Sequence, residues 1–281
     1  MPELPEVETI VRQLDQVLPG KIISSVEVLR DKSLQGESSQ AAGETISGVK
    51  RKQKIIVLKL SKNLVMLVHL KMTGQLIYQS PEKRIVGGHP TADWVGELPS
   101  KHTRVIVRFD DGSVLYFNDQ RVFGWVRVVR REEWRVTMSG MAPDVVDEAF
   151  TVEYLEKVLK KSVRAVKLVI LDQDKMGGMG NIYSCDALYL AGISPLRISS
   201  SLTVREIKSL HDAMIFVLNK GIETGGASLS HFVDTEGFGG HYQDHFQVYN
   251  KEGESCAKCG STIEKIKLGG RGTYFCPKCQ R

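Results

Sequence analysis

The spacing of apolar residues changes twice along the chain, and each change marks a change in the expected secondary structure. The N-terminal apolar residues recur at the spacing of one helical face. They are Val7, Ile10, Val11, Leu14, Val17 and Leu18. Pro5 suits the first turn of a helix, and Pro19-Gly20 is expected to end it.

From about residue 22 to 132 the pattern favours short strands, which are rich in β-branched and apolar residues. We expect strands at 55–60, 64–70, 104–109 and 114–117. The last two flank Asp110-Asp111-Gly112-Ser113, a typical hairpin turn. Residues 80–101 carry Pro, Gly and charge without a period, so we expect a loop whose role is open.

From about residue 140 the period becomes helical again. We expect helices at 151–160, 163–172, 181–191 and 203–222. Glycine-rich breaks separate them, and Asn181 after Gly180 is expected to be a helix N-cap. Residues 227–250 are polar and glycine-rich, which predicts a loop.

Four of the five cysteines lie in the last 26 residues, as Cys256-x2-Cys259-x16-Cys276-x2-Cys279. Two Cys-x2-Cys pairs at this spacing predict one tetrahedral Zn²⁺ site. Four protein ligands leave no open position for water, so the zinc is expected to be structural. Cys185 stands alone, and we expect it to be a packed residue.

These patterns predict an α+β protein: a β-rich N-terminal domain with a leading helix, a helical domain, and a zinc finger. The expected boundaries are 1–135, 136–250 and 251–281. No apolar run approaches the ~18 residues that span a bilayer, and the N-terminal residues are acidic and lack an apolar signal core, so we do not expect secretion. We therefore expect a cytoplasmic protein without a membrane partner.

Positive charge changes the picture by suggesting an anionic partner. The net charge is +5, and Arg271 lies in Gly269-Gly270-Arg271-Gly272, where a turn between two extended arms would present it to a phosphate. Two further clusters occur at 50–54 and 160–167. Each is also typical of a solvated surface, but three together favour contact with a nucleic-acid backbone.

Pro2 is the candidate nucleophile. Removal of Met1 would leave a secondary amine beside the carboxylate of Glu3. A terminal amine titrates near pH ~8, so part of it is neutral at physiological pH and can attack an electrophilic carbon. The alternative is that Pro2 and Pro5 only begin a helix.

Together these motifs resemble the bacterial formamidopyrimidine-DNA glycosylases, of the helix–two-turn–helix superfamily. The resemblance covers essentially the whole chain. It rests on Pro2-Glu3-Leu4-Pro5-Glu6, Lys54, His69-Leu70-Lys71-Met72-Thr73-Gly74, Lys101-His102, Arg121, Phe123, Gly180-Asn181-Ile182-Tyr183, Gly270-Arg271-x-Thr273 and the cysteine quartet.

The resemblance implies an N-terminal β-sandwich and a bifunctional DNA glycosylase and abasic-site lyase for oxidised purines. It implies a Schiff base on Pro2, with Glu3, Lys54 and Arg271 as the other catalytic residues. Met72, Arg121 and Phe123 would fill the gap left by the flipped base, and His102 and Asn181 would contact phosphates. The implied partner is double-stranded DNA with oxidised bases or abasic sites, bound by a monomer.

The sequence departs from the usual family pattern at a few positions. Gln120-Arg121-Val122-Phe123-Gly124 stands where the family often has Pro-Arg-Arg-Phe-Gly, and Ser184-Cys185-Asp186 replaces Ala-Asp-Glu. Residues 235–242 lie where the family places its lesion-sensing loop. Two alternatives stay open: a related glycosylase of the endonuclease VIII type for oxidised pyrimidines, and a DNA-binding protein that recognises lesions without catalysis.

Overall fold

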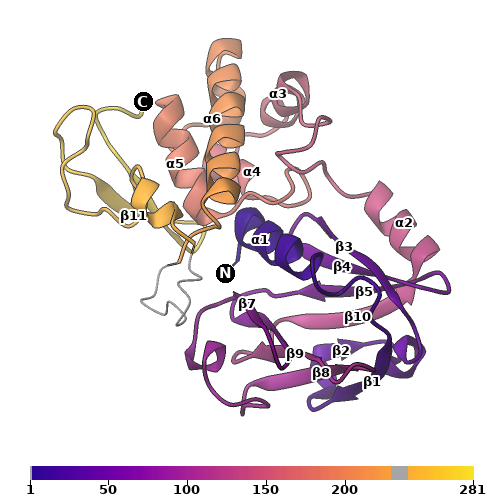
Figure 1. Ribbon diagram of the computed structural model, residues 1–281. Coiled ribbons are helices and arrows are strands. Elements are labelled where there is room, and N and C mark those ends of the chain that lie inside the picture. Colours follow the sequence, from indigo (N-terminus) through magenta and orange to yellow (C-terminus); the bar gives the residue numbers. More distant parts are fainter. Residues whose placement is uncertain (1, 229–239) are drawn as a thin grey trace. The chain divides into compact units, whose positions relative to one another are not determined.

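The computed structural model describes residues 2–228 and 240–281, which form two compact units (Figure 1). Unit 1 comprises Met1–Gly140 and Gly225–Gly240, and unit 2 comprises Met141–Thr224 and His241–Arg281. Each unit is treated separately below. Among the described residues, no helix has the length and apolar character needed to cross a bilayer.

Unit 1 contains two five-stranded sheets and the N-terminal helix α1 (Leu4–Leu14). One sheet has the order β1 (Ile23–Val28), β8 (Thr103–Phe109), β9 (Val114–Asp119), β6 (Gly74–Gln79) and β7 (Arg84–Gly88). The other has the order β2 (Leu34–Gln35), β10 (Trp125–Arg130), β5 (Leu64–His69), β4 (Ile55–Leu60) and β3 (Ile46–Lys52). The short elements are η1 (Asp31–Ser33), η2 (Ser38–Ala41), η3 (Ala92–Trp94) and α2 (Arg131–Ser139).

The inward faces of both sheets share one hydrophobic core with α1. Phe109 and Phe117 come from the first sheet, Leu58 and Val68 from the second, and Ile10 from the helix. Each of these side chains is almost completely buried, as expected when two sheets pack face to face. The predicted N-terminal sandwich with a leading helix is confirmed.

The expectation that residues 80–101 are a loop is wrong for β7, which pairs with β6 at the sheet edge. Gly87 is required by the packing of α1 on this strand, and Gly88 by the backbone of β6, because a Cβ atom on Gly88 would lie 2.3 Å from the carbonyl oxygen of Gly74. A Cβ atom on Gly87 would lie 2.2 Å from Cγ1 of Ile10, and Gly88 has a φ of +116°. Only glycine allows the strand to pass so close to the helix.

Unit 2 contains four helices and a hairpin. They are α3 (Val152–Lys160), α4 (Val166–Ile170), α5 (Asn181–Ala191), α6 (Val204–Glu223), β11 (Glu264–Leu268) and β12 (Arg271–Phe275), with η4 (Ser199–Ser201) and η5 (Tyr242–His245) between them. Thr151 and Thr203 cap α3 and α6 through their hydroxyls. Gly192 ends α5 in the left-handed conformation, with a φ of +72°.

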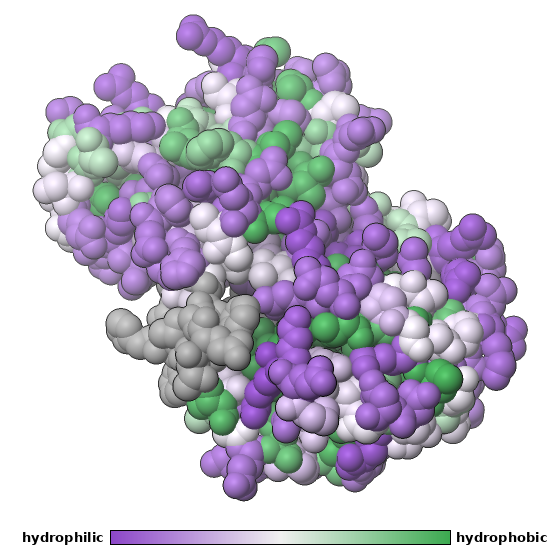
Figure 2. All heavy atoms as spheres, in the orientation of Figure 1, coloured by the Kyte–Doolittle hydropathy of each residue, from purple (hydrophilic) through white to green (hydrophobic). Residues whose placement is uncertain are grey.

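The turns between α4 and α5 are held by Gln173. Its Nε2 donates to the carbonyls of Leu171 and Met179, and its Oε1 accepts from the backbone N–H of Gly178. One side chain therefore closes the connection that places the start of α5. On the face in Figure 2, hydrophilic residues cover most of each unit and hydrophobic residues lie in separate patches.

Candidate active site and nucleic-acid interface

The predicted site residues fall in both units. Unit 1 holds Pro2, Glu3, Lys54, Met72, His102, Arg121 and Phe123, and unit 2 holds Asn181, Arg271, Cys256, Cys259, Cys276 and Cys279. Of the expected lesion-sensing segment, residues 235–239 lie outside the described residues.

Pro2 and Glu3 are both buried at the start of α1. The backbone N–H of Glu3 donates to Oε2 of Glu6 over 2.7 Å, and Oε1 of Glu6 accepts from the backbone N–H of Ala227 over 2.7 Å. A Cβ atom on Gly226 would lie 2.8 Å from Cγ of Glu6. Glu6 therefore ties the helix start to residues 226–227. Its position three residues after the N-cap is a capping signal, which the sequence analysis did not use for the site.

Lys54 is buried in the two-residue turn between β3 and β4, where Gln53 has a φ of +51°. Arg51 ties this turn to α1. Its Nε donates to Glu8 over 3.0 Å, and its Nη1 donates to the carbonyl of Gln53 over 2.8 Å. The Arg51 side chain is only 7% exposed, so this member of the 50–54 cluster is structural and does not form part of an open phosphate-binding surface.

His69 ends β5 beside the turn that carries Met72. Its Nδ1 accepts a hydrogen bond from the backbone N–H of Lys71 over 3.0 Å, which requires Nδ1 to be unprotonated. Burial, together with the charges of Lys71 and Lys54, lowers the pKa of His69 to about 3. The imidazole is therefore neutral at physiological pH, and Lys54 is near enough to influence it.

Met72 and Phe123 are large hydrophobic residues on exposed turns, with exposed fractions of 38% and 53%. Arg121 is exposed too, and its guanidinium lies 4.8 Å from the centre of the Phe123 ring. Val122 between them has a φ of +54°, a strained conformation for a β-branched residue. Exposed apolar side chains on strained turns are suited to insertion into a base stack.

Asp119 holds these two turns together. The Thr73 hydroxyl donates to Oδ1 of Asp119, and the backbone N–H of Arg121 donates to the same oxygen over 3.1 Å and to Oγ1 of Thr73 over 3.0 Å. The backbone N–H of Gly124 donates to Oδ2 over 2.7 Å. The structure thus brings the Met72 and Phe123 turns side by side through a residue that sequence reasoning missed. Its signal was an acidic residue at the end of a strand, before a turn.

His102 lies at the end of the segment that the sequence left without a role. Its Nδ1 is 3.0 Å from Oδ2 of Asp93, and its side chain is 22% exposed. The Asp93 carboxylate is buried and comes from η3. The candidate phosphate ligand therefore has a fixed acidic partner.

Asn181 is the first residue of α5, and Gly180 is the N-cap. The expectation that Asn181 is the cap is therefore wrong by one residue, because Gly180 has the extended backbone that a cap requires. The Asn181 side chain has another role. Its Nδ2 donates to the carbonyl of Gly272 over 2.9 Å, which ties α5 to the hairpin beside the exposed Arg271.

The hairpin has a two-residue turn in which Gly269 and Gly270 both have positive φ, at +57° and +76°. Such a turn matches the twist of paired strands, and Leu268 pairs with Arg271 across it. A Cβ atom on Gly269 would lie 2.4 Å from Cδ2 of Leu168. The turn between two extended arms that was expected to present Arg271 is present.

Lys167 anchors this hairpin from inside unit 2. Its ammonium donates to Oγ1 of Thr273 over 2.8 Å and contacts Sγ of Cys185 at 3.0 Å. The side chain is completely buried, so its expected place in a phosphate-tracking cluster is wrong. In the same cluster Arg164 pairs with Asp172. The Cys185 thiol is buried too, and burial raises its pKa.

The four cysteines converge, and their sulfur atoms all lie within 4.8 Å of one another. The Sγ atoms of Cys256 and Cys279 are 3.8 Å apart, and those of Cys259 and Cys276 are 3.5 Å apart. A tetrahedron with Zn–S bonds of about 2.3 Å has edges of about 3.8 Å, so the residues fit one Zn²⁺ ion. Tyr189 supports the site through its hydroxyl, 3.3 Å from Sγ of Cys256.

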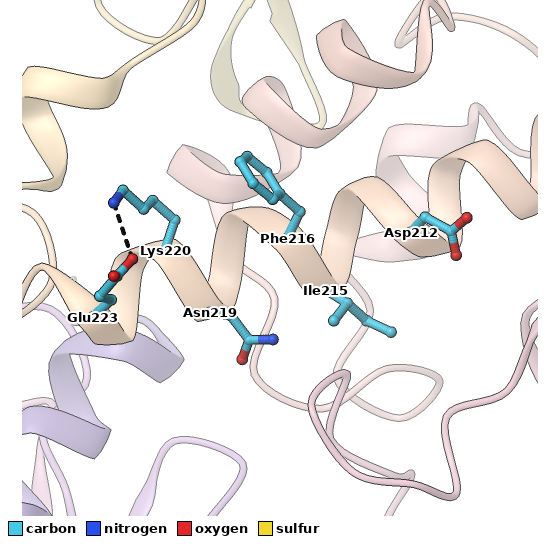
Figure 3. Close-up of a pocket in the computed structure, with 6 residues that line it drawn as sticks. All are labelled: Asp212, Ile215, Phe216, Asn219, Lys220 and Glu223. Atoms are coloured by element: carbon cyan, nitrogen blue, oxygen red, sulfur yellow. Dashed lines mark hydrogen bonds and ion pairs between the residues drawn. The ribbon is translucent and has the colours of Figure 1, made fainter.

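A surface hollow of about 630 Å³ lies along α6 and contains none of the predicted site residues (Figure 3). It is lined by Asp212, Ile215, Phe216, Asn219, Lys220 and Glu223. This hollow is therefore not the candidate site, which consists of the predicted residues, the turns that carry them and the buried carboxylates that hold them.

Three family models match successive parts of the chain. They are the formamidopyrimidine-DNA glycosylase N-terminal domain over residues 1–126, the H2TH domain of the same enzymes over 141–233, and a zinc finger found in FPG and IleRS over 253–281.

Curated relatives and solved structures cover the same length. The formamidopyrimidine-DNA glycosylases of Pelotomaculum thermopropionicum and Desulforamulus reducens are 38% and 39% identical, over all of this chain and 99% of each relative. A Lactococcus lactis Fpg in complex with an abasic site containing DNA matches with a TM-score of 0.88 and 30% identity, over the whole of both chains. A mutant of that protein with Fapy-dG containing DNA matches equally well, at 31% identity. From the start of the sandwich to the zinc finger, the chain belongs to the formamidopyrimidine-DNA glycosylase family.

Proposed function

We propose that this chain is a base-excision repair enzyme that removes oxidised purines from double-stranded DNA and then cleaves the abasic site. The observation that carries the proposal is the burial of the Glu3 carboxylate directly beside Pro2 at the start of α1. Glu3 is the N-cap of α1 and forms a capping box with Glu6, so it also begins the helix. Beside a nucleophilic amine, a buried carboxylate is in addition placed to move protons at the reacting sugar.

In the proposed reaction the Pro2 nitrogen attacks C1′ of the sugar, and the base leaves with the electron pair of the glycosidic bond. The Pro2 nitrogen gives up its proton, and Glu3 delivers a proton to O4′ as the ring opens, which gives a Schiff base in the form of an iminium ion. Loss of a proton from C2′ expels one phosphate, and a second elimination expels the other. Lys54 and Arg271 would bind the phosphates, and His102 and Asn181 would hold the kinked strand.

Met72, Arg121 and Phe123 would occupy the space left by the flipped base. Unstacking a base costs a few kcal/mol, and exposed side chains that fill the gap recover part of it. The division into 1–135, 136–250 and 251–281 and a monomeric enzyme belong to the same proposal. Zinc supplies folding energy to the finger and no step of the chemistry.

The test is borohydride trapping on a duplex that contains 8-oxoguanine. We expect a covalent protein–DNA adduct with the natural chain and none with Pro2→Gly. Pro5→Gly is the matched control, since it makes the same change three residues further on and should still be trapped. No adduct with the natural chain would favour the non-catalytic DNA-binding alternative. Faster excision of thymine glycol than of 8-oxoguanine would favour the endonuclease VIII type.

A further inference from the structure

Residues 89–102, between β7 and β8, are fixed by buried polar contacts. Arg84 donates from Nη2 to the carbonyls of Asp93 and Gly96, each over 2.8 Å. Thr91 accepts from the backbone N–H of Asp93 over 3.2 Å and so caps η3. This segment has a defined structure, and its contacts converge on the residue that faces His102.

The Asp93 carboxylate determines where the His102 ring carries its proton. Oδ2 of Asp93 accepts from Nδ2 of Asn118 over 3.1 Å and lies 3.0 Å from Nδ1 of His102. Because a carboxylate only accepts hydrogen bonds, Nδ1 must carry a hydrogen. In a neutral ring the opposite nitrogen, Nε2, is then an acceptor without a hydrogen.

A phosphate oxygen also only accepts hydrogen bonds, so a ring held in this way can bind phosphate only when Nε2 is protonated as well. We propose that Asp93 is a positioning residue that keeps the proton of a neutral His102 ring on Nδ1, so that the ring binds a phosphate by gaining a second proton on Nε2 and DNA binding takes up a proton at His102. The inference rests on the proposed function, which makes His102 a phosphate contact.

Charged residues of both signs lie on the elements around His102. They are Arg84 of β7, Asp93 of η3, Asp119 of β9, and Lys101 and Arg104 on the segment of His102 itself. Arg104 is committed to the carbonyls of Asp119 and Lys101. Within residues 2–228 and 240–281, Asp93 is the acid within hydrogen-bond distance of the ring. A bound phosphate would place a second negative charge at the opposite edge, which favours the imidazolium.

The experiment is calorimetric titration with a duplex that carries a tetrahydrofuran abasic site, in buffers of different ionisation enthalpy at pH 7.5. The dependence of the observed enthalpy on the buffer counts the protons taken up. We expect the natural chain to take up a proton on binding that His102→Gln does not take up. Asp93→Ala should lose most of this uptake and weaken binding on the order of tenfold. Glu97→Gln, which removes an exposed acid from the same segment, should retain the full uptake.

The inference is overturned if Asp93→Ala binds weakly but still takes up the natural number of protons, because Asp93 would then be only structural. It is also overturned if His102→Gln binds with the natural affinity and proton uptake. Should Asp93→Ala fail to fold, ¹⁵N spectra of the natural chain decide, since a neutral His102 ring protonated at Nε2 contradicts the geometry. Borohydride trapping with Pro2→Gly tests the proposed function separately, and Glu97→Gln should form the adduct like the natural chain.

Discussion

Asp119 is the residue on which the geometry of the two turns that carry Met72 and Phe123 depends. Its two oxygens accept from Thr73, Arg121 and Gly124, and a single amide oxygen cannot replace them. We expect Asp119→Asn to lower the free energy of unfolding by about 1–3 kcal/mol, because buried donors lose their acceptor. Urea unfolding followed by tryptophan fluorescence measures it, since all three tryptophans lie in unit 1. Asp110→Asn, in an exposed turn, should unfold like the natural chain, and equal stabilities for the two variants would contradict the role of Asp119.

His69 should make unit 1 sensitive to acid. Its pKa is about 3 when folded, below the ordinary value near 6.5, so the unfolded chain binds more protons at intermediate pH. The stability that comes from the neutral ring is full above pH ~6.5 and is lost as the pH falls toward 3. We expect His69→Gln to reduce the slope of unfolding free energy against pH by up to about 1.4 kcal/mol per unit between pH 6 and 4. Urea unfolding at a series of pH values, followed by tryptophan fluorescence, measures the slope. The control, the exposed His241→Gln, should keep the slope of the natural chain. An unchanged slope in His69→Gln would mean that the His69 ring is already charged in the folded protein.

At the scale of elements, regular period and turn chemistry predicted every α-helix of the described residues except α2, but only β4, β5, β8 and β9 among the strands of the sandwich. β4 was predicted at its observed bounds, and α5 was wrong only in its cap. β7 was missed because its glycines serve close contacts with α1 and with β6, which a local pattern does not contain. α2 was missed because Trp134 is its one fully buried side chain, too few for a helical period.

Buried charge was harder to predict than secondary structure. Lys167 and Arg51 look like members of solvated clusters, yet both are held by partners that are distant in sequence. The sequence around Asp93 and Asp119 does not indicate their roles, because each of them positions another residue and carries no motif of its own. The zinc ligands and the turn of Arg271 were predictable, since cysteine spacing and consecutive glycines fix their own local geometry.

The link between Lys167 and Thr273 should stabilise the hairpin on the helical core. Thr273→Val keeps the shape of the side chain and removes the acceptor of a buried ammonium. We expect the free energy of unfolding of unit 2 to fall by about 1–3 kcal/mol, and zinc to be released at a lower temperature. Zinc release can be followed with a chromogenic chelator during the melt. The exposed Thr262→Val is the control, and identical release curves for the two variants would show that the link contributes nothing.

For the whole molecule, the zinc site and the helical core of unit 2 depend on each other. Cys256, Cys276 and Tyr274 pack in one cluster with Cys185 and Tyr189 of α5. We expect zinc removal by a chelator to weaken binding to a duplex with an abasic site on the order of a hundredfold, because the hairpin loses its fold.

Arg271→Ala should be a milder form of the same defect, on the order of tenfold, since the hairpin remains folded and only one phosphate contact is lost. Fluorescence anisotropy at fixed salt gives both values. Lys278→Ala removes another exposed cation from the finger and should have a smaller effect. A zinc-free protein with the natural affinity would show that the finger is not part of the DNA interface.

The contact between Glu6 and Ala227 has a consequence for how the enzyme can be divided or synthesised. The acid that positions the first helical turn finds its partner beyond the entire run of helices from α3 to α6. A fragment that ends at Gly140 would include every strand of the sandwich but would leave Oε1 of Glu6 without that donor. On the ribosome, Pro2 and the helix that follows it likewise emerge first, and this helix completes its packing only after residue 227 has been made.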